Sequence, residues 1–285
     1  MDVEEYVFVR KINFELDNTI TKKEPELYFR MHEGSAVARF ETLSNVNHQN
    51  LHIITRRHAD YGDNLMHTLT FPQEFRSIQA HYPIFFRKQA DTGVFEAVAM
   101  FGFKHEQNLF LDENGWDASY IPLMILRQPF LIGFQQQQEN GEMVKRPVVQ
   151  VDMENPRISN SEGERVFMEF GGYTEYLNKM VSILDYIHYG HETSRLFMQA
   201  LVALNLIESL TVDIELEDGS KNQLIGYYTI NEDVLNKLPQ EDLFRLHQHG
   251  FLEPIYMVLA SQSRIAEMIA RINARNKNER LAAQN

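Results

Sequence analysis

Hydrophobic and polar positions alternate most regularly within residues 210–272. Val212, Ile214 and Leu216 are separated by polar residues, a period of two that is typical of a strand with one buried face. Asp218-Gly219 follows and favours a tight turn, because such turns need residues that tolerate positive φ. Residues 224–230 are then rich in β-forming side chains. This stretch predicts a β-hairpin.

The pattern changes to helical spacing after the hairpin. Asn231 can cap a short helix that ends at Pro239, and a second helix over 240–249 would end at Gly250. Pro254 suits the first turn of a last helix, whose hydrophobic residues between 255 and 272 fall near one stripe. We therefore expect hairpin, helix, helix and long helix to form one packed unit.

The preceding segment, 173–206, also has helical spacing and predicts a long helix. Thr174 is its expected cap, and Gly190 in its middle predicts a kink or a close contact. Together with the upstream strands, these elements predict an α+β fold. A mainly antiparallel β region is followed by a long helix, a β-hairpin and C-terminal helices.

The β region covers residues 42–152 and contains several short hydrophobic runs. Strands are predicted at 51–55, 67–71, 82–88 and 94–103, with a short helix before Pro83. The last of these runs is apolar on both faces around 98–103, which indicates a central, buried strand. A further pair, 130–134 and 147–151, predicts a hairpin joined by a polar loop over 135–146.

The pattern divides the chain into three parts. Residues 1–41 form an N-terminal extension, interpreted as an edge strand or cap on the main domain or as a partner-binding arm. Residues 42–275 form the main domain, and 276–285 a polar C-terminal tail.

Composition excludes several classes of protein. The net charge of −13 argues against nucleic-acid binding, which normally needs a basic face. The absence of cysteine excludes disulfides, cysteine-ligated zinc and a cysteine nucleophile. No run of about 18 apolar residues is present, so no membrane span is predicted, and the acidic first residues do not form a signal peptide. We expect a cytoplasmic protein.

Polar and aromatic residues are densest within 105–134. The binding candidates are Asn108, Asp112, Trp116, Asp117, Tyr120 and Arg127, together with Asp152 and Arg157 further along. Their carboxylates could gather into an acidic pocket for acid–base chemistry or a divalent cation. The aromatic residues and Arg127 could stack on a sugar or a peptide. The alternatives are solvated carboxylates and aromatic rings packed against the sheet.

A weaker metal site is suggested on the long helix. Asp185, His188 and Glu192 lie within two helical turns, a spacing by which helical bundles present metal ligands. No second helix supplies matching ligands, so a solvated helix face is the favoured interpretation. No cofactor is predicted, because the chain has no G-x-S-x-G, Walker A, G-x-G-x-x-G or H-E-x-x-H motif.

Separated motifs in the same order carry a family resemblance over about residues 42–272. They include HYPIFF, VFEAVAMFGF, NLFLDENGWDASYIPLMILRQPF, VDMENPRISNSEGERVF and TVDIELEDG. The chain resembles the SapC family of bacterial proteins. The resemblance implies a surface-layer or transport-cluster component, whose genes commonly lie near TonB-dependent receptors and tryptophan-halogenase-like flavoproteins. It implies no catalytic residues.

Two functions follow as expectations. The first is a non-enzymatic accessory or binding protein that acts by protein contacts in a bacterial surface-layer, nutrient-uptake or flavoenzyme-linked system. Its protein partner is unidentified, and a homo-oligomer stays open. The alternative is a metal- or small-molecule-dependent enzyme with a site around 108–127 and Asp152.

Overall fold

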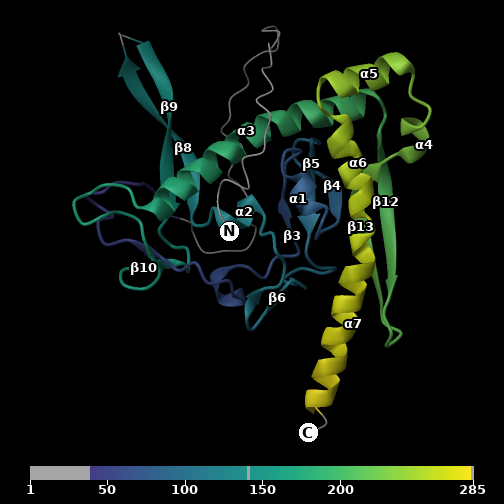
Figure 1. The fold of residues 1–285 in the computed structure, drawn as a ribbon, viewed down its shortest axis with the longest axis horizontal. Coiled ribbons are helices and arrows are strands. Elements are labelled where there is room, and N and C mark those ends of the chain that lie inside the picture. Colours follow the sequence, from purple (N-terminus) through teal and green to yellow (C-terminus); the bar gives the residue numbers. More distant parts are fainter. Residues whose placement is uncertain (1–38, 140–141, 284–285) are drawn as a thin grey trace.

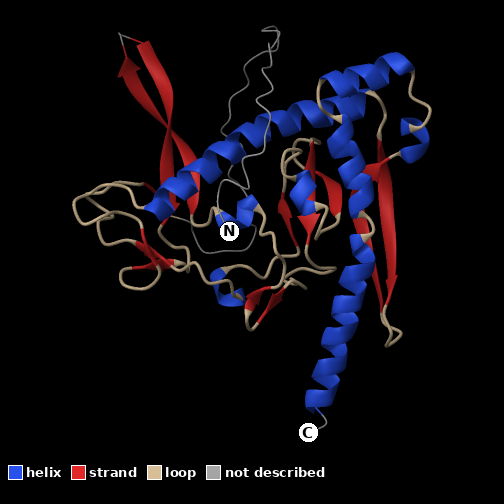
Figure 2. Ribbon diagram, viewed as in Figure 1, coloured by secondary structure: helices blue, strands red, loops and turns tan. Residues whose placement is uncertain are grey.

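A computed structural model describes residues 39–139 and 142–283 of the chain, and its fold is α+β (Figures 1 and 2). The strands are β1 (Phe40–Thr42), β2 (His52–Ile53), β3 (His67–Leu69), β4 (Ile84–Lys88), β5 (Phe95–Met100), β6 (Leu111–Asp112), β7 (Gly115–Trp116), β8 (Phe130–Glu139), β9 (Glu142–Asp152), β10 (Ile158–Ser159), β11 (Glu164–Arg165), β12 (Ile207–Glu215) and β13 (Lys221–Ile230). The helices are α1 (Phe75–Ile78), α2 (Leu123–Leu126), α3 (Glu175–Ala203), α4 (Glu232–Leu235), α5 (Gln240–Gln248), α6 (Leu252–Ser261) and α7 (Arg264–Ala283), with a 3₁₀ turn at Ala59–Tyr61.

The main sheet has the strand order β12-β13-β4-β5-β3 and is antiparallel throughout. The predicted hairpin is confirmed as β12 and β13. It does not stand apart from the earlier β region, because Tyr228 of β13 pairs with Phe86 of β4. Strand β5 is interior and its second half is buried, as its apolar sequence predicts.

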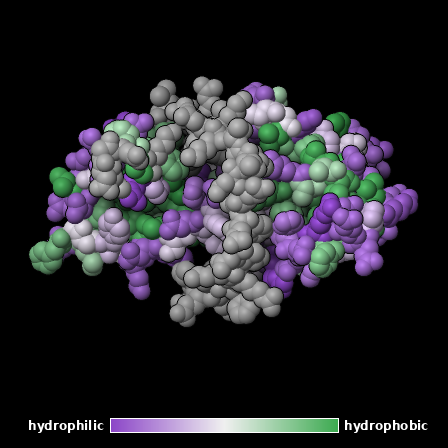
Figure 3. All heavy atoms as spheres, turned by 90° about the horizontal axis from the view of Figure 1, so that it is seen from above, coloured by the Kyte–Doolittle hydropathy of each residue, from purple (hydrophilic) through white to green (hydrophobic). Residues whose placement is uncertain are grey.

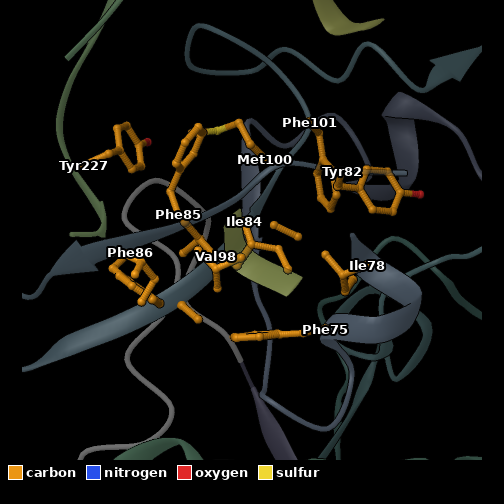
Figure 4. Close-up of a cluster of buried hydrophobic side chains, with 14 of the residues drawn as sticks. Phe75, Ile78, Tyr82, Ile84, Phe85, Phe86, Val98, Met100, Phe101 and Tyr227 are labelled. Atoms are coloured by element: carbon orange, nitrogen blue, oxygen red, sulfur yellow. The ribbon is translucent and has the colours of Figure 1, made fainter. Parts of the chain in front are cut away.

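Two buried clusters form the core. The larger packs the main sheet against α1, the second half of α3 and the C-terminal helices; Figure 4 shows Phe75, Phe85 and Phe86 among its members. The smaller cluster lies between β8, β9 and the first half of α3. Burial of such side chains contributes about 1.5–3 kcal/mol each relative to exposure.

Helix α3 crosses the molecule and belongs to both clusters (Figure 1). Thr174 caps it as predicted, since its Oγ1 accepts a hydrogen bond from the Leu177 amide at 3.2 Å. Gly190 is at a close contact, because a Cβ at this position would lie 2.9 Å from Cγ of Phe71. A methyl group there would therefore force the two elements apart.

The polar segment 135–146 differs from its prediction as a loop. Strand β8 extends into it as far as Glu139 and β9 begins at Glu142, with Gln135 opposite Arg146, so that the two strands form a ribbon that projects from the body (Figure 1). The prediction was wrong because hydrophobic alternation marks a strand only where one face is buried. From Phe134 to Gln138 the ribbon is exposed, so the sequence carries no such alternation.

The predicted last helix is two helices, α6 and α7, with a break at Gln262–Ser263. The break is stabilised by contacts with the start of β4. Ser261 Oγ accepts a hydrogen bond from the Ile84 amide at 2.9 Å, and Gln262 Nε2 donates to the Ile84 carbonyl at 3.2 Å. Helix α7 then continues through residues 276–283, the stretch predicted as a polar tail.

The N-terminal part of the chain is described from residue 39 onward. Strand β1 pairs with β9 at Phe40–Asp152, so the last residues of the predicted N-terminal extension form an edge strand. Residues 1–38, and with them the alternative of a partner-binding arm, lie outside the described residues. No helix in the described part of the chain is long and apolar enough to span a membrane.

Candidate functional site

The predicted site residue Asn108 is buried and organises its own loop. Its Nδ2 donates to the Asp63 carbonyl at 2.8 Å, and its Oδ1 accepts from the Phe110 amide at 2.9 Å. Its carbonyl accepts a hydrogen bond from Arg275 of α7. Both side-chain amide atoms are therefore occupied within the fold, and the backbone carbonyl holds the loop against α7.

The predicted aromatic residues point into the core. Trp116 Nε1 donates to the Tyr82 hydroxyl at 2.8 Å, and its ring lies edge-on to Phe101 with centroids 5.2 Å apart. The Tyr120 hydroxyl donates to Glu74 Oε1 at 2.7 Å. These contacts favour the packing interpretation over an open stacking surface.

Glu74 is a buried carboxylate that the sequence did not single out. Its oxygens accept from Tyr120, from Thr70 Oγ1 at 2.8 Å and from the Leu123 amide at 2.7 Å. Burial raises the pKa of Glu74, although these hydrogen bonds oppose the shift. A glutamate beside a short helix carries no sequence signal of burial, since most such residues are solvated.

Arg157 is buried and Arg127 is half-buried, and both bind backbone carbonyls of the fold. Arg157 is 1% exposed and reaches Asp63 Oδ2 at 2.5 Å. It also donates to two backbone carbonyls, those of Ile54 and Arg56. Arg127 donates to the Phe130 carbonyl at 2.7 Å, and burial lowers its pKa to about 10.

Asp63 receives a second guanidinium, which completes a buried charge cluster. Arg57 Nη1 lies 3.2 Å from its Oδ1, and the His58 amide donates to Oδ2 at 2.9 Å. Burial, and then the charge of Arg157, lowers the pKa of Arg57. The cluster ties residues 54–63 to the segment around Arg157.

The predicted acidic residues do not come together. Asp112 accepts from the Asn114 amide within its own turn, and Asp117 forms an ion pair with Arg271 at 2.6 Å. Asp152 instead accepts from backbone amides at the β1–β9 edge. Across residues 39–139 and 142–283, no three His, Asp or Glu side chains lie where they could hold a metal ion. Asp185, His188 and Glu192 are exposed on α3 and do not form such a group either.

Two hollows flank Arg275 on the surface beside these buried residues. The larger has a volume of about 410 Å³ and lies between α7, residues 104–107 and the β12–β13 turn. The smaller, about 320 Å³, is bounded by His58, Asp112 and Glu113. Of the predicted site residues, Asn108 and Asp112 line the smaller hollow.

A second candidate site is an apolar surface before α3, which we call the Phe170 surface. It consists of Val46, Met168, Phe170 and Tyr173, all exposed. Asn45 Nδ2 donates to the Gly171 carbonyl at 3.1 Å, so the two contributing loops lie side by side. They occupy the left-hand end of the molecule in Figure 1, and Figure 3 shows hydrophobic surface at this end.

The Phe170 surface was missed because its residues resemble a core segment. Four of the five residues in the run VFMEF are hydrophobic, and Val166 and Phe167 are indeed buried. The pair Gly171-Gly172 follows this run directly. A large aromatic residue placed directly before such a pair is a usable signal for a turn tip.

Comparison with known proteins identifies one family. The SapC family profile matches residues 43–268, which is most of the chain. Searches of curated proteins and of solved structures each found no match. The matched region contains the smaller core cluster, the Phe170 surface, and the larger core cluster apart from Ile269 and Ile272 on α7. The chain belongs to the SapC family.

Proposed function

We propose that this chain is a non-enzymatic binding protein that acts through protein contacts at the Phe170 surface. One observation carries the proposal: the Phe170 side chain is 97% exposed on an ordered turn. A phenylalanine in contact with water forgoes about 1.5–3 kcal/mol of burial free energy, which a partner can recover. Aromatic residues at the centre of an apolar patch are typical binding hot spots.

The turn holds Phe170 in a defined position. The Gly171 amide donates to the Met168 carbonyl at 2.9 Å, and the Met168 amide donates to the Gly172 carbonyl at 2.7 Å. Phe167 and Tyr173 pair as an antiparallel bridge at its base. Because the backbone is already fixed, little conformational entropy is lost when the surface docks.

The surrounding charges favour one kind of partner. Glu169 within the turn and Glu175 at the start of α3 are exposed, and within the described ranges neither forms an ion pair. Acidic residues around an apolar centre complement a protein pocket with a basic rim. They oppose an anionic lipid surface. The accessory role in a surface-layer, uptake or flavoenzyme-linked system, and a cytoplasmic location, belong to this same proposal.

The enzymatic alternative has less support. Asp112, Asp117 and Asp152 each bind a different group of the fold, so no acid–base pair is assembled from these three predicted residues.

The test compares Phe170→Ala with Phe244→Ala, a matched control because Phe244 is also exposed but lies on α5. The tagged chain is purified from its native cells, the co-purifying protein is identified, and its affinity is then measured with purified components. We expect Phe170→Ala to weaken binding about thirtyfold, corresponding to about 2 kcal/mol, and Phe244→Ala to leave it unchanged.

Three results would contradict the proposal. The first is equal binding by both variants. The second is self-association that is lost in Phe170→Ala, which would make the occupant a second copy. The third is the absence of a stoichiometric partner together with turnover of a metabolite.

A further inference from the structure

The larger hollow beside α7 is lined by several charged and polar side chains, among them Arg275. Helix α7 carries three arginines that each pair with a carboxylate: Arg264 with Glu267, Arg271 with Asp117, and Arg280 with Asp218. Arg275 differs from them. Its two terminal nitrogens donate to the backbone carbonyls of Asn108 and Leu111, and in the part of the chain that the structure describes no carboxylate neutralises it.

Arg275 is thereby a fixed positive charge in a concave site. A guanidinium held by two carbonyls keeps its full charge and has a defined direction. Lys104 lines the same hollow as a second, flexible cation, exposed and without an ion pair among the described residues. Together they provide a site for an anionic group such as a carboxylate.

Two negative charges line the same hollow. Glu106 and Glu279 are exposed, and no ion pair of either is found in the described ranges. Glu106 adopts φ 54°, a left-handed conformation that residues other than glycine rarely adopt. Asn64 Nδ2 holds it there by donating to its carbonyl at 2.6 Å. Backbone strain of this kind is concentrated at functional sites.

Neutral polar groups complete the lining. Asn222 and Asn276 are half-buried, and their side-chain amides form no hydrogen bond with another described residue. Half-buried groups of this kind gain most from a ligand that satisfies them. The lining therefore offers two cations, two anions and two free amides around about 410 Å³.

We infer that this hollow binds a small zwitterion of the amino-acid type. The ligand carboxylate binds Arg275 and Lys104, and its ammonium group binds Glu106 or Glu279. The free amides bind the remaining polar atoms of the ligand. The four side-chain charges cancel, so the site favours a ligand that carries both signs over a simple anion or cation. This site is independent of the Phe170 surface.

The probes are the standard amino acids, supplied singly at millimolar concentration to the full-length chain. Binding is measured by thermal shift and then by calorimetry for any amino acid that raises the Tm. The same measurements use the deaminated acid and the decarboxylated amine of that amino acid. We expect the zwitterion to bind at least about tenfold more tightly than either analogue.

Variants of the lining residues test whether the ligand binds in the hollow. Arg275→Gln and Lys104→Gln should each weaken binding at least about tenfold. Lys277→Gln is the matched control, because Lys277 is an exposed residue of α7 that does not line the hollow. Lys104 makes no contact that the fold needs, so its variant remains informative if Arg275→Gln fails to fold. The inference is overturned if no amino acid binds, if Lys104→Gln binds normally, or if the deaminated acid binds equally well.

Discussion

Removal of the buried carboxylate of Asp63 should be among the most damaging single changes in this protein. Asp63 is 0% exposed and faces Arg157 at 2.5 Å and Arg57 at 3.2 Å. Asp63→Ala leaves both guanidinium groups in the interior without a counter-ion. Breaking a buried ion pair by removing one partner typically costs about 3–5 kcal/mol, and we expect a loss of stability in this range.

Removal of the arginine partner should destabilise the protein less than removal of Asp63. In Arg157→Met the Asp63 carboxylate keeps Arg57 and the His58 amide as partners. In the double variant Asp63→Ala/Arg157→Met one of the two uncompensated charges is gone. Its destabilisation should therefore be smaller than the sum of the two single losses by about 0.5–3 kcal/mol.

Urea unfolding followed by fluorescence provides the assay. Trp116 is the only tryptophan, and its indole is packed against Phe101, so its emission reports the packing of the larger cluster. Asp91→Ala, at an exposed aspartate, is the control and should change stability by less than about 0.5 kcal/mol. A loss below about 1 kcal/mol for Asp63→Ala, or strict additivity in the double variant, would refute the role assigned to the charge cluster.

Three further predictions concern buried polar groups. Burial raises the folded-state pKa of Glu74 above 4.5. The contribution of Glu74 to stability is therefore complete below about pH 4.5 and is lost as the pH rises through the folded pKa. Unfolding measured at a series of pH values should show this fall in stability in the natural chain and not in Glu74→Gln. Burial, and then the charge of His188, lowers the pKa of His191 from 6.5 to about 4. Up to about 3 kcal/mol of stability present above pH 6.5 should therefore be lost on acidification to pH 4, and His191→Gln should not show this loss. Equal acid sensitivity of the natural chain and the variant would contradict this prediction. Ser261→Ala leaves the buried Ile84 amide without its acceptor and should lower the free energy of unfolding in urea by about 1–3 kcal/mol. Ser263→Ala, at an exposed serine, is the control and should change it little. Similar losses for the two variants would contradict the role of Ser261 at the α6–α7 break.

Local features of the fold were predictable because a few neighbouring residues determine them. The β12–β13 hairpin follows from alternation and its Asp218-Gly219 turn. Thr174 and Asn231 cap their helices through contacts only three residues away, at 3.2 and 2.9 Å. Such contacts depend on local sequence alone, so spacing and residue type suffice.

Long-range contacts were not predictable in this way. The pairing of Tyr228 with Phe86 joins segments 142 residues apart in sequence, and the ion pair of Asp63 with Arg157 joins segments 94 residues apart. No periodicity encodes either contact. The segment chosen as a site was the polar and aromatic stretch around Trp116. That composition proved to reflect hydrogen bonds that hold α7 and the sheet together. Phe170 was not singled out at all, because large hydrophobic residues are usually buried.

The sharing of α3 between the two core clusters has a consequence for how the molecule opens. Leu177 and Leu184 belong to the smaller cluster, whereas Phe197 and Leu201 belong to the larger. Amide hydrogen exchange should therefore divide this one helix into two protection classes that meet near Gly190. Loss of the smaller cluster would fray the helix from its first turn. The backbone beneath the Phe170 surface would then exchange with the first half of α3, while the main sheet stays closed.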